Sequence, residues 1–427
     1  MLKYYRIKDL AKVSTGGTPS REDEGNFTSN KNDGVMWIKP EDLKGTKDFI
    51  RETREYITCL GLKKMKKFSP HDSIIFSGIG EIGKMGIAKN DFTTNQQNHI
   101  LYSISCNRDY LFYSLFSKRK NINKLAKGNV VKIFNSSELK RIIVGIPENE
   151  KQLKIVKYLR KNENSLEDKI KKYNKKIELL KEYKEALIYE TVTKGLDKNI
   201  EMKDSGIDWI GRIPKSFSIK RLKDVYIYKN GYSFSDEDYS EENNGNYLIK
   251  ITQIKEDGIN INKEMVIKDN DRNKLFKIKK MSILYALSGA TAGKSCFFDS
   301  EYKCYLNQRV AEIRLKKGNS KYLYYIFKNK QMQHIILNSK QSTAQPNINK
   351  SDIDNFIIPY ISNINKQNEI VDFLDKKTKE IDSEVEILSK KIGLIEELKE
   401  SIIYECVTGK IDIEVDGEKY QKIIESI

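Results

Sequence analysis

The sequence contains little of the material from which metal sites and most catalytic sites are built. It has only three histidines, His71, His99 and His334, and its five cysteines form no Cys-x-x-Cys pair. A zinc cluster or a histidine-centred catalytic site is therefore not expected, and the odd number of cysteines indicates reduced thiols. No apolar run reaches the length of a membrane span, and the first ten residues lack the apolar core of a signal peptide. The sequence predicts a cytoplasmic protein with no metal, no bound cofactor and no membrane partner.

Three short motifs that suggest an enzyme are incomplete. The segment GATAGKS resembles a phosphate-binding loop, but only three residues separate Gly289 from Gly293, where that loop requires four. An earlier copy, Gly78 to Lys84, has the four residues but is followed by Met85 in place of the Ser or Thr that binds magnesium. The segment FSGIG fits a short glycine motif of methyltransferases, yet the seven prolines are never adjacent, so an Asx-Pro-Pro-aromatic motif is missing. No convincing set of clustered carboxylates indicates a nuclease, and we predict no catalytic residue.

The formal net charge is +17, from 77 basic and 60 acidic residues. An excess of this size favours a polyanionic partner, because each Lys or Arg placed near a phosphate releases a condensed counterion. A lysine-rich composition can also follow from the base composition of the genome. Charge alone therefore favours nucleic acid without establishing it.

One pattern occurs twice, at residues 152–197 and 367–412. A shift of 215 positions aligns QLKIVKYLRK with QNEIVDFLDK and KEALIYETVTKGLD with KESIIYECVTGKID, and about 18 of the 46 positions are then identical. The same shift aligns RIKDLAKVSTG at 6 with RLKDVYIYKNG at 221. With one gap, DSIIFSGIGEIGK matches MSILYALSGATAGK, and Asn95-Gln96 corresponds to Asn307-Gln308. The chain is therefore predicted to be two copies of one module.

Apolar residues in both copies recur at alternating steps of four and three, which is typical of a two-helix coiled coil. Lys184 and Lys399 occupy the same position of this pattern in the two copies. The alternative is two separate surface helices. The predicted seam residues are Leu166, Ile170, Tyr173, Ile177, Leu180, Lys184 and Leu187 in the first copy, and Ile381, Val385, Leu388, Ile392, Ile395, Lys399 and Ile402 in the second.

Chain connectivity favours an antiparallel pair. A helix of about 42 residues is roughly 60 Å long, and the segment between the helices must join the end of the first to the start of the second. A parallel pair would force that segment back along the full helix, whereas an antiparallel pair needs no such return. We therefore expect a dumbbell with one globule at each end and an approximate two-fold axis.

Each globule is predicted to be of mixed α/β class. In the first, the short apolar runs ITCL at 57, SIIFSGIG at 73, HILYSIS at 99 and RIIVGIP at 141 alternate with turn signals and one helical stretch. A Lys-Gly pair at 194–195 should end the first long helix. The predicted parts are a first globule at 1–147, a long helix at 148–194, a connector at 195–215, a second globule at 216–359, a second long helix at 360–408 and a C-terminal tail at 409–427.

The positive signal for binding is a glycine-bearing turn with a lysine, repeated in both globules and followed by an Asn-Gln pair. Glycines allow close backbone approach, lysines can meet phosphates, and amides can pair bidentately with adenine. The alternative is that the glycines form a sheet corner and the amides only fill loops. The candidate DNA-binding residues are Lys39, Lys84, Gln96, Gln97, Asn98, Lys132, Lys250, Gln253, Lys294, Gln308, Arg309, Gln341 and Gln345.

Several of these segments together resemble the specificity subunits of type I restriction-modification enzymes. They are STGGTPS at 14, GVMWIKPEDL at 34, DSIIFSGIGEIGK at 72, IDWIGRIPKSFSIKRLKDV at 207, SILYALSGATAGK at 282 and the two helix ends EALIYETVTKGLD and ESIIYECVTGKID. One departure is Phe217, which stands where the family usually has a second Trp. The resemblance extends over essentially the full chain.

The resemblance implies two target-recognition domains joined by an antiparallel two-helix coiled coil. Each domain would read one half of a bipartite asymmetric sequence in double-stranded DNA, and the helices would set the unread spacer, with about 18 base pairs as an upper bound. It further implies two modification subunits that methylate adenine with S-adenosylmethionine, restriction (motor-nuclease) subunits, and no catalysis by this chain. The alternatives are a stand-alone DNA-modifying enzyme and a coiled-coil protein without DNA affinity.

Overall fold

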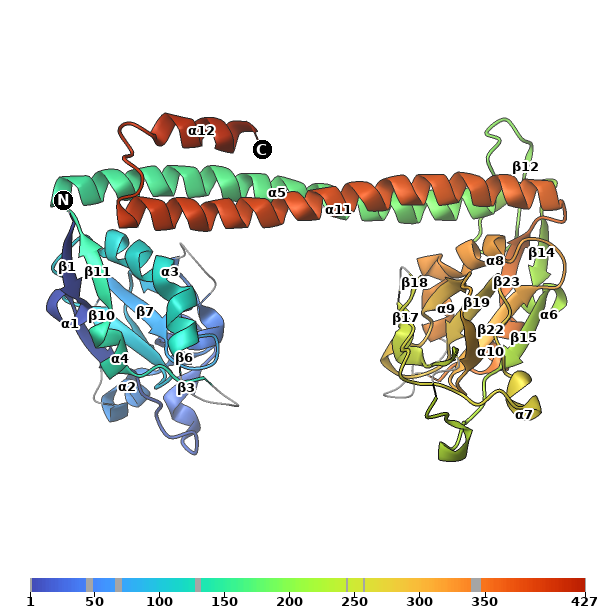
Figure 1. The fold of residues 1–427 in the computed structure, drawn as a ribbon, viewed down its shortest axis with the longest axis horizontal. Helices are drawn as coiled ribbons and strands as arrows, with labels where there is room; N and C mark the ends of the chain where they lie inside the picture. The colour runs from blue at the N-terminus through green and yellow to red at the C-terminus, as the bar shows by residue number, and fades with distance from the viewer. Residues whose placement is uncertain are drawn as a thin grey trace. The chain divides into compact units, whose positions relative to one another are not determined.

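The computed structural model describes residues 2–43, 49–65, 71–126, 132–242, 245–255, 258–338 and 347–426. They pack into two units: the first comprises Met1–Asn174 and Leu388–Ile427, and the second comprises Lys175–Ile387. The two long helices, α5 (Asn149–Lys194) and α11 (Ile364–Thr408), each contribute one part to each unit (Figure 1). A packing unit is therefore a globule together with the helical segments that cover it.

The globule of the first unit is built on a mixed sheet with the strand order β2-β10-β7-β8-β5. A smaller sheet, β3-β6-β4-β9, and the pair β1-β11 complete it. The strands are β1 (Lys3–Arg6), β2 (Lys12–Thr15), β3 (Phe27–Thr28), β4 (Val35–Ile38), β5 (Phe49–Ile50), β6 (Tyr56–Ile57), β7 (Ser73–Ser77), β8 (Met85–Ala88), β9 (Phe92–Thr94), β10 (Asn98–Tyr102) and β11 (Ile143–Ile146). The helices are α1 (Ile7–Leu10), η1 (Glu24–Asn26), η2 (Pro40–Asp42), α2 (Cys59–Met65), α3 (Arg108–Leu125) and α4 (Ser136–Arg141).

The second unit repeats this plan. Its main sheet has the order β15-β22-β19-β20, which corresponds to β2-β10-β7-β8, and its pair β14-β23 corresponds to β1-β11. The strands are β12 (Met202–Asp204), β13 (Arg212–Pro214), β14 (Ser218–Arg221), β15 (Tyr226–Asn230), β16 (Asn246–Ile249), β17 (Ile254–Lys255), β18 (Gly258–Ile259), β19 (Ser282–Ala286), β20 (Ser295–Phe298), β21 (Lys303–Leu306), β22 (Val310–Leu315) and β23 (Ile357–Tyr360). The helices are α6 (Leu222–Val225), η3 (Asp236–Asp238), η4 (Ile251–Gln253), α7 (Asp271–Lys274), η5 (Gly289–Thr291), α8 (Ser320–Phe327), α9 (Lys330–Asn338) and α10 (Lys350–Asp354). The predicted mixed α/β class and the duplication are confirmed.

The run ITCL at 57 is a strand only at its start. Strand β6 ends at Ile57, and α2 begins at Cys59 because the Thr58 hydroxyl accepts a hydrogen bond from the Gly61 backbone N–H at 3.2 Å. A threonine in this position satisfies one of the free N–H groups at a helix start. This local cap ends a strand that β-branched composition alone would extend.

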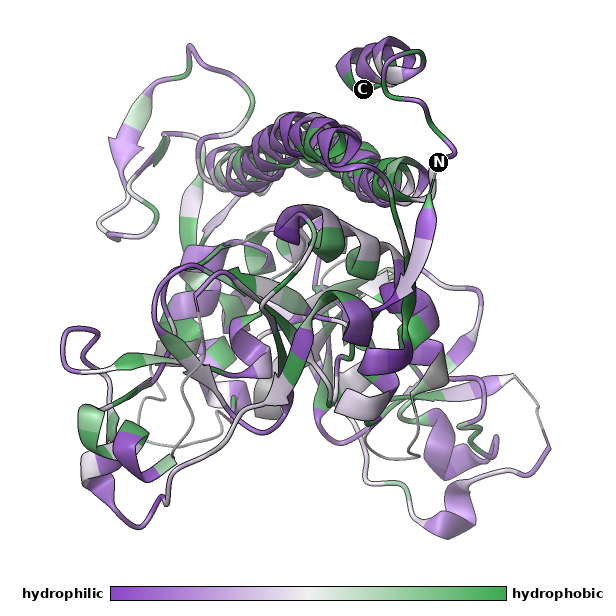
Figure 2. Ribbon diagram, turned by 90° about the vertical axis from the view of Figure 1, so that its left-hand side faces the viewer, coloured by the Kyte–Doolittle hydropathy of each residue, from purple (hydrophilic) through white to green (hydrophobic). Residues whose placement is uncertain are grey.

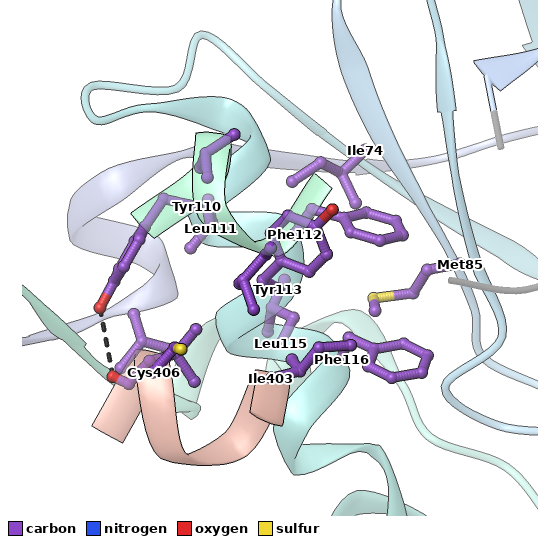
Figure 3. Packing of buried hydrophobic residues seen from close by; sticks show 14 of the residues in the cluster. Ile74, Met85, Tyr110, Leu111, Phe112, Tyr113, Leu115, Phe116, Ile403 and Cys406 are labelled. Carbon is purple, nitrogen blue, oxygen red and sulfur yellow. Dashed lines mark hydrogen bonds between the residues drawn. The ribbon is translucent and has the colours of Figure 1, made fainter. Parts of the chain in front are cut away.

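The core of the first unit extends from the sheet into the long helices. Tyr110, Phe112, Leu115 and Phe116 of α3 are buried between the sheet and the end of α11 (Figure 3). The Tyr110 hydroxyl donates to the carbonyl of Val407 at 3.2 Å. Burying each large apolar side chain contributes about 1.5–3 kcal/mol. Helix α3 thus attaches the globule to the helical segments of the same unit.

The globules are attached to the long helices by one repeated glutamine. In the first unit, the Gln152 amide donates to the Pro147 carbonyl and accepts from the Asn107 backbone N–H, both at 2.8 Å. In the second, Gln367 donates to the Ile361 carbonyl at 2.6 Å and accepts from the Asn319 backbone N–H at 2.8 Å. Both glutamines are buried. A buried amide whose groups are paired fixes the orientation of the elements that it joins.

Within each unit the two long helices run antiparallel, as predicted. In the first, Lys399 lies 2.9 Å from Glu167 and 3.5 Å from Glu163. In the second, Lys184 lies 2.6 Å from Asp382. Because the shift of 215 positions converts Lys184 into Lys399 and Glu167 into Asp382, the same ion pair occurs in both units. How the units are placed relative to each other, and hence the dumbbell, stays a prediction.

None of the predicted seam residues is exposed, whereas most of the residues between them in the sequence are exposed to solvent. Both hydrophobic and hydrophilic residues occur on the long helices (Figure 2). Leu166, Ile381, Leu388, Ile395 and Ile402 are buried. Ile170, Tyr173, Ile177, Leu180, Lys184, Leu187, Val385, Ile392 and Lys399 are half-buried.

Glycine ends both long helices, and a further helix follows the second. Gly195 and Gly409, directly after α5 and α11, have φ angles of +74° and +72°, the left-handed conformation of a helix C-cap. The sequence predicts only a tail at 409–427, but α12 (Gly417–Ser426) lies along α5 (Figure 1). Lys169 donates to the Ile424 carbonyl at 2.5 Å, and the Ile424 side chain is fully buried. In the described part of the chain, no helix is long and apolar enough to cross a membrane.

Candidate nucleic-acid interface

Several loops of the first unit that are far apart in sequence meet at one edge of its sheets. We call the loops at 16–18, 38–39, 78–84, 95–98 and 132–134 the first edge. The Gly78 backbone N–H donates to the Gln97 carbonyl at 2.9 Å, and the Asn95 N–H donates to the Ile38 carbonyl at 3.3 Å. The Phe134 N–H donates to the Gly78 carbonyl at 2.8 Å. These bonds hold the glycine turn beside the Asn-Gln turn.

The second unit has the same arrangement in the loops at 231–232, 249–250, 287–294, 307–309 and 347–348, which we call the second edge. The Leu287 N–H donates to the Arg309 carbonyl at 3.0 Å, and the Asn307 N–H donates to the Ile249 carbonyl at 3.1 Å. The Ile348 N–H donates to the Leu287 carbonyl at 2.7 Å. Each bond has its counterpart in the first edge.

Glycine is required where the backbones cross at each edge. A Cβ atom on Gly16 would lie 2.2 Å from the Thr94 carbonyl oxygen, and one on Gly231 would lie 1.9 Å from the Asn307 carbonyl oxygen. No side chain tolerates such contacts, so both glycines serve the close approach of two loops.

The candidate DNA-binding residues at the first edge differ in exposure and in the contacts that their side chains already make. Gln96 is exposed and accepts from the Thr18 hydroxyl at 2.5 Å, while Gln97 is half-buried and accepts from the Asn95 amide at 2.9 Å. Lys132 is exposed, with two weak contacts of 3.3 Å to Asn123. Lys39 forms an ion pair with Glu55, and Lys84 forms one with Glu81.

Two candidates are used by the fold itself. Asn98 is fully buried, and its amide donates to the Ile38 carbonyl at 3.0 Å. Gln253 is also buried, and its side chain accepts from the Lys250 backbone N–H at 3.0 Å, which caps η4. Both residues hold an edge loop in shape, so we no longer expect either to contact a base. Their burial could not be predicted from the sequence, because the residue type is the same whether an amide side chain is exposed or buried.

At the second edge, the other candidates face solvent. Gln308 and Arg309 are exposed, and Lys250 and Lys294 are half-buried. Among the described residues, no carboxylate lies within ion-pair distance of these three cations. Gln341 and Gln345 lie outside the described residues.

A charged and aromatic cluster that the sequence did not indicate adjoins the first edge. The Arg21 guanidinium binds Glu55 through two hydrogen bonds of 2.6 and 2.9 Å, and its central carbon lies 4.2 Å from the centre of the Phe27 ring. Lys39 lies 4.6 Å from the Trp37 ring centre. The hydrogen bonds from Arg21 and the ion pair with Lys39 lower the pKa of Glu55 to about 2. Arg21 and Glu55 are 34 positions apart, so only the fold reveals their pairing.

His99 and three of the five cysteines are buried in the structure. Burial lowers the pKa of His99, whose Nε2 donates to the Phe134 carbonyl at 2.8 Å. Burial raises the pKa of the Cys296, Cys304 and Cys406 thiols to about 12, so at neutral pH they carry no nucleophilic thiolate. Within the described ranges, no group of three or more His, Cys, Asp or Glu residues could hold a metal ion.

A family model described as the type I restriction modification DNA specificity domain matches the chain twice, at residues 2–179 and 214–391. The chain belongs to this family. Each specificity-domain repeat contains one globule, one edge and the N-terminal part of one long helix, which agrees with the duplication seen in the fold.

Curated relatives come from Methanocaldococcus jannaschii. The type I restriction enzyme MjaIX specificity subunit is 25% identical over 427 residues, covering 96% of this chain and 93% of the relative. The MjaVIII specificity subunit is 26% identical over 359 residues, covering 79% and 77%. Both alignments extend over most of the two proteins.

Two solved structures share the fold. The first is a chain from a structure described as the structural basis underlying complex assembly and conformational transition of the type I R-M system. It has a TM-score of 0.73 at 12% identity, and the match covers 95% of the present chain and 97% of the solved chain. The HsdS subunit from Thermoanaerobacter tengcongensis has a TM-score of 0.53 at 12% identity, with coverage of 96% and 97%.

Proposed function

We propose that this chain is the DNA sequence-specificity subunit of a type I restriction-modification complex. Each globule reads one half of a bipartite asymmetric target in double-stranded DNA, and the paired helices set the length of the unread spacer. The observation that carries this proposal is the repeated edge. The same backbone hydrogen bonds hold the glycine turn and the Asn-Gln turn together in both units, while side chains at some matching positions, such as Gln97 and Arg309, differ.

A constant frame with variable side chains is what reading two different half-sites requires. Exposed amides such as Gln96 and Gln308 can pair with adenine, and Arg309 can pair bidentately with guanine. The net charge of +17 favours the DNA backbone as a partner. The two edges are therefore the surfaces that we expect to contact DNA.

The chemistry is expected in other subunits. Two modification subunits would bind this chain, hold S-adenosylmethionine and methylate adenine, and restriction (motor-nuclease) subunits would join for cleavage. Labelled S-adenosylmethionine incubated with DNA and the purified chain should give no methyl transfer until the modification subunit is added. Turnover by the chain alone would instead support a stand-alone DNA-modifying enzyme.

The spacer prediction can be tested on the methylated genome. Mapping methylated adenines in a strain that carries this chain should reveal two half-sites separated by a fixed gap. Deleting one heptad from α5 and the opposing heptad from α11 removes about 10 Å, so the gap should shorten by about three base pairs. The half-sites should stay the same. If the half-site sequences change instead, the helices do not act as a spacer.

A further inference from the structure

We infer that the two edges bind DNA with different salt dependence, and that most of the salt-sensitive contacts with the phosphate backbone belong to the second edge. Lys250, Lys294 and Arg309 contact phosphates there. The lysines at the same places in the first edge are neutralised by carboxylates of the protein itself. This inference rests on the proposed function, because it assumes that both edges bind DNA.

The first matched pair is Lys39 and Lys250. Each follows a strand end and begins a short 3₁₀ helix, with its backbone N–H donated to the side chain three residues later. That side chain is Asp42 in the first edge, at 2.9 Å, and Gln253 in the second, at 3.0 Å. The positions are therefore equivalent in backbone structure, and an acid at the first edge is replaced by a neutral amide at the second.

The carboxylate that neutralises Lys39 is also missing from the second edge. Glu55 accepts a hydrogen bond at its backbone carbonyl from the Trp37 N–H at 3.2 Å, and the equivalent bond runs from the Leu248 N–H to Met265 at 2.9 Å. Met265 thus stands where Glu55 stands in the first unit. Without that carboxylate, Lys250 has no described ion-pair partner.

The second matched pair is Lys84 and Lys294, which end the two glycine turns. The Lys84 backbone N–H donates to the Glu81 carbonyl at 3.3 Å, and the Lys294 N–H donates to the Thr291 carbonyl at 3.0 Å. In the first edge, Glu81 also forms an ion pair with the Lys84 side chain. Thr291 cannot do so, which leaves the Lys294 ammonium free of a described carboxylate.

The third matched pair is Gln97 and Arg309, whose carbonyls accept equivalent hydrogen bonds from Gly78 and Leu287. A neutral, half-buried amide in the first edge is replaced by an exposed guanidinium in the second. All three comparisons therefore change the local charge in the same direction. A cation already paired with a carboxylate releases few counterions from DNA, because the carboxylate repels the phosphate that the cation would attract.

Salt dependence of DNA binding separates the two edges. The full-length chain is titrated with a labelled duplex of mixed sequence over a range of salt concentrations, since phosphate contacts do not depend on sequence. Each phosphate contact contributes about −0.9 to the slope of log K against log salt, so the slope is steeper when more phosphates are contacted. Lys250→Ala, Lys294→Ala and Arg309→Ala should each lower the magnitude of the slope by about one. Lys39→Ala and Lys84→Ala should leave it unchanged.

Two substitutions exchange the character of the edges. Thr291→Glu places a carboxylate beside Lys294 and should lower the magnitude of the slope by about one. Glu81→Gln removes the carboxylate beside Lys84 and should raise the magnitude of the slope by about one. Glu81 is exposed, so the latter change is not expected to disturb folding; equal melting temperatures check this for every variant. Equal slope losses for Lys84→Ala and Lys294→Ala would overturn the inference but not the proposed function. If the unchanged chain, with or without the modification subunit, shows no salt-sensitive binding, both fail.

Discussion

The duplicated lysines Lys399 and Lys184 each have an acidic neighbour at the equivalent position of the opposing helix, but their other surroundings differ. Lys399 also approaches Glu163, whose side chain is only 2% exposed and accepts a hydrogen bond from the Tyr113 hydroxyl at 2.5 Å. The counterpart of Glu163 in the second unit is Thr378, which donates to its own helix at 2.7 Å. One copy of the ion pair has thus become part of a buried network, whereas the other stays at the surface.

The attachment of the globules shows a second difference between the units. In the first, Asp109 at the start of α3 pairs with Arg160 of α5. In the second, Lys321 at the start of α8 pairs with Asp375 of α11 at 2.7 Å. The positions correspond, but the charges are reversed. Geometry has been kept between the copies and charge has not, so each globule is electrostatically matched to its own helix.

The largest difference between the units should appear when the two lysines are removed. Lys399→Ala removes the ammonium group that lies 3.5 Å from the buried Glu163 carboxylate and should cost about 3 kcal/mol of unfolding free energy. Lys184→Ala should cost less than about 1 kcal/mol, because its partner Asp382 is 55% exposed. Denaturant unfolding of both variants measures this. Equal losses would mean that burial does not distinguish the two pairs.

The double variant Lys399→Ala with Glu163→Gln sharpens this comparison. A neutral amide at position 163 removes the buried charge while it keeps the size of the side chain. Much of the stability lost in Lys399→Ala should then return. If none returns, the loss comes from the packing of the lysine stem and not from the buried charge.

Acid should separate the units by a smaller amount through Glu55. Its pKa in the fold is about 2, below the ordinary value of 4.5, so its ion pairs stabilise the protein above about pH 4.5 and are lost as the pH falls toward 2. We expect Glu55→Gln to cost about 1–2 kcal/mol at pH 7 and almost nothing near pH 2. Met265→Gln at the matching place in the second unit is the control, whose effect should not depend on pH. Equal losses for Glu55→Gln at both pH values would contradict the assignment.

The reversed ion pair should give the smallest effect. Arg160→Asp places two carboxylates together and should cost about 1 kcal/mol or less, because the Arg160 side chain is 45% exposed. Adding Asp109→Lys recreates the charge order of the second unit and should restore most of the loss. A double-mutant cycle from thermal unfolding measures the coupling. Additive losses would show that the two side chains do not interact.

Much of the frame could be predicted from the sequence because periodicity repeats. The alternating steps of four and three place Leu166 through Leu187 and Ile381 through Ile402 on one side of each helix, and none of the predicted seam side chains is exposed. The helix stop at Gly195 follows from a local conformational rule. Helix α12 could not be foreseen, because a helix of ten residues is held by its contacts with α5 and not by its own propensity.

Less of the two edges than of the helices could be predicted from the sequence. Sequence repetition marked the glycine turns and the Asn-Gln turns, since both copies keep them. It could not tell the buried Asn98 from the exposed Gln96, nor show that Glu55 neutralises Lys39. Burial and pairing depend on which distant strands lie next to each other.

The sequence by itself determined the duplication, the mixed class of the globules and the two long helices, because repeats, periodicity and glycine signals act over short stretches of chain. Only the tertiary structure decided which amides and cations remain free at each edge. A side chain becomes available or occupied through neighbours that are distant in sequence, and only the folded chain brings those neighbours within hydrogen-bond distance.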